Sequence, residues 1–226
     1  MGVIARLGFP ALLALACVCA TRSGVAKDES NARFADSVDG RDWAAYGRTF
    51  GEQHYSPLTE INASNVSRLG LAWSMDLPQG NSATVPLAVD GVLYFVSGLS
   101  VVHAADAATG KPLWVYGPEV AKAAGHSLQG GWGSRGIAYW NGKVYTGTTD
   151  GRLIAMDAHT GRPVWSSRTY ERDELRYVTG APRVFDGKVI IGHGGADFAS
   201  SAAPVHSHRN GRIARDTNRA LNVKPL

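Results

Sequence analysis

Few residues of this 226-residue chain stand in spacings that carry chemistry by themselves. His206 and His208 could hold a metal ion together, but two imidazoles in such a polar segment are more often solvated. The two cysteines, Cys17 and Cys19, lie in an apolar run near the N-terminus and form no zinc-binding set. The chain also has no G-x-S-x-G nucleophile motif and no P-loop. These patterns do not assign a function, so the organisation of the chain is the better guide.

An internal repeat gives the strongest signal. Two segments share the template A-x-D-x-x-T-G-x-x-x-W, and they begin 51 residues apart at Ala104 and Ala155. In each copy the Asp and Thr can hydrogen-bond backbone groups of a tight turn, and the Gly supplies a positive φ at its exit. The Trp then starts a strand that buries a large ring. A coincidental turn before a buried Trp does not account for two copies with identical spacing. Repeats of this length predict β-propeller blades.

Strand and turn signals recur at regular intervals between the repeats. Asn141-Gly142 and Asp150-Gly151 are hairpin turns, and 44% hydrophobic residues with 27 glycines favour turn-rich β structure. Four short strands per repeat is the pattern of a propeller blade, so we expect an all-β fold with about two and a half blades in residues 42–199. The expected strands span residues 71–77, 91–96, 101–105, 135–140, 143–148, 152–156, 177–184 and 188–192.

The segments that flank these blades differ in composition. Residues 27–41 are polar and are expected to be flexible, and an irregular stretch then leads to a short helix at 65–70 that Asn62 or Ser64 caps. Residues 200–226 carry five basic side chains against one acidic one, without an aromatic residue or a strand pattern. A basic tail can indicate nucleic-acid binding. The absence of aromatics favours an unstructured, solvated tail and no nucleic-acid partner.

The N-terminus has the pattern of an export signal. Arg6 precedes an apolar run at 7–20, and small residues follow, so residues 1–26 predict a secretory signal peptide cleaved after Ala20 or Ala26. The run is too short to span a membrane. A lipoprotein anchor at Cys17 is the alternative. Cleavage would remove both cysteines, and the mature protein would lie in the periplasm without a disulfide.

The repeat, the segment D-W-A-A-Y-G-R-T at 42–49 and the segment L-G-L-A-W at 69–73 together resemble the pyrroloquinoline-quinone (PQQ)-dependent alcohol dehydrogenases. The resemblance covers residues 40–198. It implies an eight-bladed propeller with PQQ and calcium near the axis. It also implies oxidation of a primary alcohol to an aldehyde, with electrons passed to a cytochrome c. The alternative is a non-catalytic propeller scaffold of the outer-membrane assembly type, which shares the blade motif.

The resemblance assigns roles to two polar residues. Arg135, in S-R-G-I-A-Y-W, matches the arginine that contacts the quinone oxygens, where forked donors stabilise negative charge. Its alternative is a surface arginine at the start of a strand. Thr179, in V-T-G-A-P-R, matches the threonine that hydrogen-bonds a cofactor carboxylate. Its alternative is an ordinary strand threonine.

A third matching segment follows at 194–197. Gly194, Gly195 and Ala196 match small residues that let backbone amides approach the cofactor, since glycine has no Cβ. Asp197 matches a calcium ligand that is usually Glu in the family, so a changed metal distance or a different divalent ion is expected. Its alternative is a turn aspartate.

The chain also departs from the family. Residues 129–133 replace a pair of cysteines that form a disulfide over the quinone; Trp132 could cover that face or pack as a core ring. Residues 81–87 hold no acid where the family has a glutamate. The catalytic aspartate of the family belongs to later blades. We therefore expect the N-terminal third of a dehydrogenase, inactive by itself, or a frame-disrupted product whose sequence changes character after Ala199.

Overall fold

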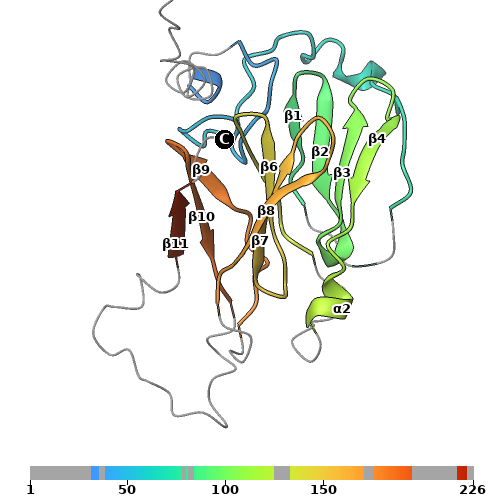
Figure 1. Ribbon diagram of the computed structural model, residues 1–226. Helices are drawn as coiled ribbons and strands as arrows, with labels where there is room; N and C mark the ends of the chain where they lie inside the picture. Colours follow the sequence, from blue (N-terminus) through green and yellow to red (C-terminus); the bar gives the residue numbers. More distant parts are fainter. Residues whose placement is uncertain are drawn as a thin grey trace, which may run out of the picture.

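The computed structural model describes residues 32–35, 39–77, 80, 84–124, 133–170 and 176–194, and the backbone of 218–222 (Figure 1). Two four-stranded antiparallel sheets follow each other along the chain, each with its strands in sequence order. This confirms the all-β prediction of successive blades. The first sheet contains β1 (Leu87–Val89), β2 (Val92–Val96), β3 (Val102–Asp106) and β4 (Pro112–Tyr116). The second contains β5 (Ala138–Trp140), β6 (Lys143–Gly147), β7 (Arg152–Asp157) and β8 (Pro163–Arg168).

A third sheet corrects the prediction for the tail. β9 (Arg183–Phe185) and β10 (Lys188–Gly192) form the hairpin expected at the Asp186-Gly187 turn. β11 (Asn218–Asn222) then pairs antiparallel with β10, although residues 200–226 were expected to form no strand. Backbone groups on an open sheet edge can pair with a segment that lacks an alternating side-chain pattern. The rest of the tail, with His206 and His208, lies outside the described residues, as does segment 1–26, for which the sequence predicts a signal peptide.

The repeated turns have the hydrogen bonds that their sequence predicts. The Asp106 carboxylate accepts hydrogen bonds from the Thr109 amide (2.8 Å) and hydroxyl (2.6 Å), and Asp157 accepts the same pair from Thr160. These bonds, led by the one from the threonine hydroxyl, lower the pKa of both aspartates. Gly110 and Gly161 follow with φ of 70° and 69°. Both turns therefore have the same local structure.

Tryptophan rings connect each blade to the next. The Trp73 indole lies on Gly110, where a Cβ atom would come within 2.5 Å of the ring, and its Nε1 donates to the Ala107 carbonyl at 3.1 Å. Residues 71–77 form no strand, so that prediction was wrong. Trp73 is fixed by its ring rather than by a backbone ladder, and Leu71 beside it is 85% exposed. The sequence pattern detected the half-buried Trp73 ring but assigned it to a strand.

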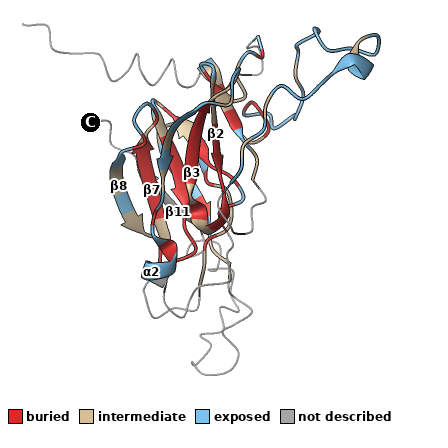
Figure 2. Cartoon of the chain, turned by 90° about the vertical axis from the view of Figure 1, so that its right-hand side faces the viewer, coloured by how far each residue is buried: buried red, intermediate tan, exposed pale blue. Residues whose placement is uncertain are grey.

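The segment before the first blade forms an exposed arm. Residues 50–77 are almost all exposed, and in Figure 2 this pale-blue arm extends away from the buried strands. The predicted helix at 65–70 is a single 3-10 turn, η1 (Val66–Arg68), whose N-cap is Asn65 and not Asn62 or Ser64. The Asn62 carboxamide oxygen instead accepts from the Ser64 amide and hydroxyl. This local turn precedes η1, which ends where Leu69 takes an extended backbone (φ −64°, ψ 135°).

The core lies within and between the sheets. Its buried side chains come mainly from β2, β3, β6 and β7, where Tyr145, Leu153, Ile154 and Met156 are fully buried. The second and third sheets meet closely at Gly147, because a Cβ atom there would lie 2.5 Å from both Ile191 and Val178. A short helix, α2 (Val120–Ala124), follows the first sheet. Among the described residues we find no helix with the length and hydropathy of a membrane span.

Candidate cofactor-binding site

The segments that enter the three sheets lie side by side and hold two of the predicted site residues together. The Arg135 amide donates to the Thr179 carbonyl at 2.7 Å, and the Arg135 carbonyl accepts from the Val85 amide at 3.3 Å. Val85 and Gly136 form a parallel bridge. Arg135 therefore sits between the first and third sheets, with both of its backbone polar groups bonded across blade boundaries.

The side chains of Arg135 and Thr179 are available for a ligand. Arg135 is exposed and Thr179 is half-buried. Among the described residues, none forms an ion pair or a side-chain hydrogen bond with the Arg135 guanidinium. A guanidinium has five N–H donors and no acceptor, so it binds carboxylate, phosphate or carbonyl oxygens. The Thr179 hydroxyl is a second hydrogen-bonding group, on the residue whose carbonyl accepts from the Arg135 amide.

Gly194 joins this pair through the backbone of the third blade. Its amide donates to the Tyr177 carbonyl at 2.8 Å, and the Tyr177 amide donates back at 3.2 Å, two residues before Thr179. A Cβ atom at Gly194 would come within 2.7 Å of the Tyr177 ring. A side chain at 194 would therefore displace the Tyr177 ring, so glycine has a packing role here whether or not a cofactor approaches it.

The rest of the predicted site lies outside the described residues. Gly195, Ala196 and Asp197, and also Trp132, belong to segments that the structure does not describe. Within the described ranges, no three His, Cys, Asp or Glu side chains gather in a group that could hold a metal ion. The calcium ligand therefore stays a prediction.

Two residues beside Arg135 were missed by the sequence analysis. The Ser134 hydroxyl donates to the Gly136 carbonyl at 2.6 Å and reaches the Gly180 carbonyl at 3.3 Å. Gly133 packs against the backbone of the first sheet, where a Cβ atom would lie 2.3 Å from the Ser97 carbonyl oxygen. The only available signal was their position next to Arg135, because a serine or a glycine alone predicts no contact across blades.

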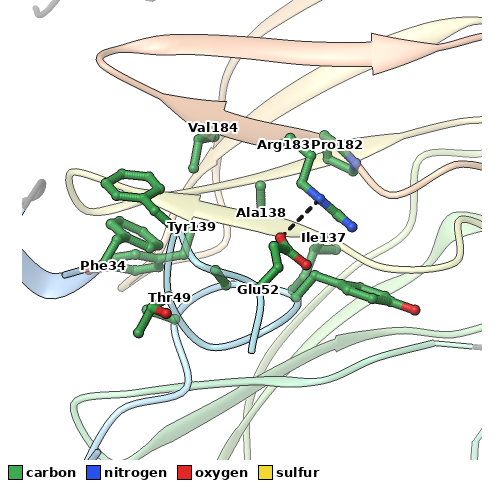
Figure 3. A pocket seen from close by; sticks show the side chains of 13 residues that line it. Phe34, Thr49, Glu52, Ile137, Ala138, Tyr139, Pro182, Arg183 and Val184 are labelled. Carbon is green, nitrogen blue, oxygen red and sulfur yellow. Dashed lines mark ion pairs between the residues drawn. The ribbon is translucent and has the colours of Figure 1, made fainter. Parts of the chain in front are cut away.

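An apolar cavity of about 140 Å³ lies farther along the same strands, and Arg135, Thr179 and Gly194 do not line it. It is enclosed by β5, by the start of β9 and by the segment 44–52 (Figure 3). At its edge Arg183 pairs with Glu52 at 3.4 Å, and its guanidinium lies 4.4 Å from the centre of the Tyr46 ring. These contacts tie the N-terminal segment to the third blade.

Comparison with known proteins agrees with this architecture. The family described as "PQQ: Glucose/ethanol/alcohol dehydrogenase, beta-propeller domain" matches residues 43–210. Quinohemoprotein alcohol dehydrogenase ADH IIB of Pseudomonas putida is 51% identical over 173 residues, which are 76% of this chain and 25% of that protein. The 1-butanol dehydrogenase (cytochrome c) of Thauera butanivorans is 47% identical over 162 residues, 70% of this chain and 23% of that protein.

A solved structure shows the same relationship in three dimensions. The quinohemoprotein alcohol dehydrogenase from Comamonas testosteroni superposes with a TM-score of 0.68 at 42% identity, covering 77% of this chain and 28% of that one. The chain thus spans about a quarter of the length of the relatives it matches. By its blade repeat, its sheet order and these matches, the chain belongs to the PQQ-dependent glucose, ethanol and alcohol dehydrogenase β-propeller family.

Proposed function

We propose that this chain forms part of the cofactor rim of an exported PQQ- and calcium-dependent alcohol dehydrogenase. The hydrogen bond from the Arg135 amide to the Thr179 carbonyl supports the proposal, because it brings the backbones of these two residues from neighbouring blades together. Arg135 is exposed and makes no ion pair with a described residue, and a guanidinium of this kind can bind the oxygen atoms of an anionic ligand. The substrate we propose is a small primary alcohol, oxidised to an aldehyde.

The described residues fit the chemistry of PQQ. PQQ is a planar quinone that carries three carboxyl groups, so a protein site needs donors for oxygen atoms and little competing negative charge. Arg135 offers such donors and makes no ion pair with a described residue. Thr179 adds a hydroxyl that is only half-buried. We propose that Arg135 binds the quinone oxygens, that Thr179 binds a carboxylate and that 194–196 provides close backbone approach.

When bound, PQQ supplies a two-electron acceptor for the oxidation of the alcohol. Arg135 would orient the quinone and stabilise negative charge on its oxygens, since a guanidinium donates forked, charged hydrogen bonds to oxygen atoms. Thr179 would fix the angle of the ring system through the carboxylate. Asp197 would supply a hard oxygen ligand to calcium. Each role is a separate prediction for one side chain.

We propose that alcohol turnover needs the further blades that the longer relatives possess, and that the 226 residues bind PQQ without catalysis. The matched relatives are about four times as long as the aligned region. The name of the Thauera relative pairs its alcohol oxidation with a cytochrome c, which supports a cytochrome c as the electron acceptor here. Residues 1–26 support export to the periplasm.

Equilibrium dialysis of the purified chain against PQQ, with and without calcium, tests this proposal. We expect saturable binding of about one PQQ per chain that calcium strengthens, and no dye-linked oxidation of ethanol or 1-butanol by the loaded protein. Absence of PQQ binding under both conditions would favour the non-catalytic scaffold. Alcohol oxidation by the chain alone would overturn the proposed need for further blades.

A further inference from the structure

The loop between β2 and β3 is a strained turn beside the candidate site. Its residues 97–101 include the short helix η2 (Gly98–Ser100), in which Leu99 and Ser100 have φ of 56° and 59°. Side chains other than glycine rarely adopt this left-handed region. Two consecutive residues of this kind persist only where the surroundings hold them.

The turn is anchored on its own sheet. The Ser97 amide donates to the Val101 carbonyl at 2.8 Å, which closes the loop. The Ser97 hydroxyl lies 2.8 Å from Nε2 of His103, a buried residue of β3. The His103 ring stacks on Phe95 of β2 with 4.9 Å between centroids and 7° between planes. These contacts fix the Ser97 carbonyl, which points at the next blade.

Gly133, in the segment that enters the second blade, packs closely against the turn at 97–101. An added Cβ atom would lie 2.3 Å from the Ser97 carbonyl oxygen and 3.0 Å from the Ser100 amide nitrogen, both of which are backbone atoms that cannot rotate away. Gly133 is buried, and Arg135 follows two residues later. Between them, Ser134 bonds the Gly136 and Gly180 carbonyls. The chain entering the second blade is therefore held on both sides.

We propose that Gly133 and the turn at 97–101 form a backbone clamp that positions Arg135 for its ligand. The turn at 97–101 packs against one side of the segment 133–135. The hydrogen bond from the Arg135 amide to the Thr179 carbonyl holds the other side of this segment in place. Gly133 and Ser97 are positioning residues, since they act on the ligand only through Arg135. The identity of that ligand as PQQ rests on the proposed function, whereas the clamp itself does not.

Hydrogen exchange of the Arg135 amide measures the clamp directly, because this amide donates across the blade boundary. We expect Gly133→Ala to speed exchange at Arg135 by at least about tenfold relative to the core amide of Ile154. Gly117→Ala is the matched control, since a Cβ atom there meets nothing within 4 Å, and it should change neither rate. Equal acceleration at Arg135 and Ile154 would indicate general destabilisation and overturn the clamp.

A second pair of variants avoids the steric insertion. Ser97→Ala removes the hydroxyl that contacts His103, and we expect a smaller, about threefold acceleration at Arg135. Ser100→Ala removes a buried hydroxyl of the same turn that has no partner among the described residues, and it should leave Arg135 unchanged. If both serine variants behave alike, the anchoring by Ser97 is wrong.

PQQ affinity then separates the clamp from the proposed function. We expect Gly133→Ala to weaken PQQ binding about tenfold and Gly117→Ala to leave it unchanged. If the unmodified chain binds no PQQ but the exchange rates behave as expected, the clamp stands and the proposed function fails. If Gly133→Ala binds PQQ as the unmodified chain does, the clamp does not position Arg135 for this ligand.

Discussion

The Trp114 indole lies directly on Gly161 of the following blade, and its Nε1 donates to the Ala158 carbonyl at 2.9 Å. A Cβ atom at Gly161 would come within 2.5 Å of the ring carbons. Trp73 makes the same pair of contacts with Gly110 and Ala107 one blade earlier. The repeated glycine therefore serves two purposes, a positive φ and contact with the tryptophan of the preceding repeat.

This contact predicts a large difference between two glycine substitutions. Gly161→Ala should destabilise the chain by at least about 2 kcal/mol more than Gly142→Ala, because overpacking against a ring adds to backbone strain. Gly142 is the matched control, with φ of 68° against 69° and nothing within 4 Å of an added Cβ atom. Urea unfolding of both variants measures the difference. Equal losses would show that only the backbone conformation matters.

A buried ion pair predicts a second stability effect. Asp150 has a side chain only 1% exposed, and Arg152 Nε donates to it at 2.6 Å while another guanidinium nitrogen donates to the Pro118 carbonyl. Arg152→Met should cost about 3 kcal/mol, since it leaves a buried carboxylate without its cation. The added substitution Asp150→Asn should recover part of that loss.

The exposed pair of Lys122 and Glu119 is the control for that experiment. Its nitrogen and oxygen are 3.7 Å apart, and both side chains are more than 70% exposed. Lys122→Met should change the free energy of unfolding by less than about 0.5 kcal/mol, because solvent screens the pair. A loss as large as that of Arg152→Met would contradict the importance of burial.

His103 predicts a dependence of stability on pH. Burial lowers the pKa of His103 below its ordinary 6.5, because its charged form loses hydration. The unfolded chain therefore takes up the proton at a higher pH than the folded one. The contribution of His103 to the free energy of unfolding should be complete above about pH 6.5. It should fall as the pH drops from there toward the folded-state pKa.

His103→Gln tests this assignment, because glutamine does not titrate and its amide group can donate to or accept from the Ser97 hydroxyl. Urea unfolding between pH 8 and pH 5 should show a smaller loss for the variant than for the unmodified chain. Identical pH profiles would mean that other groups cause the acid destabilisation.

Thr179 predicts an effect on cofactor binding without one on folding. Thr179→Val preserves the shape of the side chain and the carbonyl that accepts from Arg135, and it removes the hydroxyl. We expect PQQ to bind about three- to tenfold more weakly at an unchanged free energy of unfolding. Thr59→Val in the exposed arm is the control and should bind PQQ as the unmodified chain does.

Local sequence signals predicted most of the fold. The Asp, Thr and Gly of each repeat and the Asn-Gly and Asp-Gly hairpins are short-range patterns, and their turns formed as expected. The errors at residues 71–77 and in the tail occurred where long-range contacts decide the structure. Residues 71–77 have strand character but pair with no strand in the described part of the chain, and β11 pairs along the open edge of β10. The sequence of one segment does not show whether a partner strand lies beside it or whether a sheet elsewhere has an open edge.

The residues of the candidate site could likewise be predicted from sequence only in part. Arg135 and Thr179 could be selected from sequence, and their contact across 44 residues follows from the order of the blades. The turn at 97–101 could not be found, because Leu99 and Ser100 give no sign of their left-handed backbone. Gly133 could be explained only once the Ser97 carbonyl was placed beside it.

The central claim is that Arg135 belongs to a PQQ site, and titration calorimetry with PQQ and calcium on Arg135→Gln tests it most directly. Arg68→Gln, in the exposed arm, is the matched loss of one positive charge. We predict that Arg135→Gln weakens PQQ binding at least about tenfold, the loss expected for a charged hydrogen bond, while Arg68→Gln retains the affinity of the unmodified chain. Equal affinities for the two variants would contradict the account.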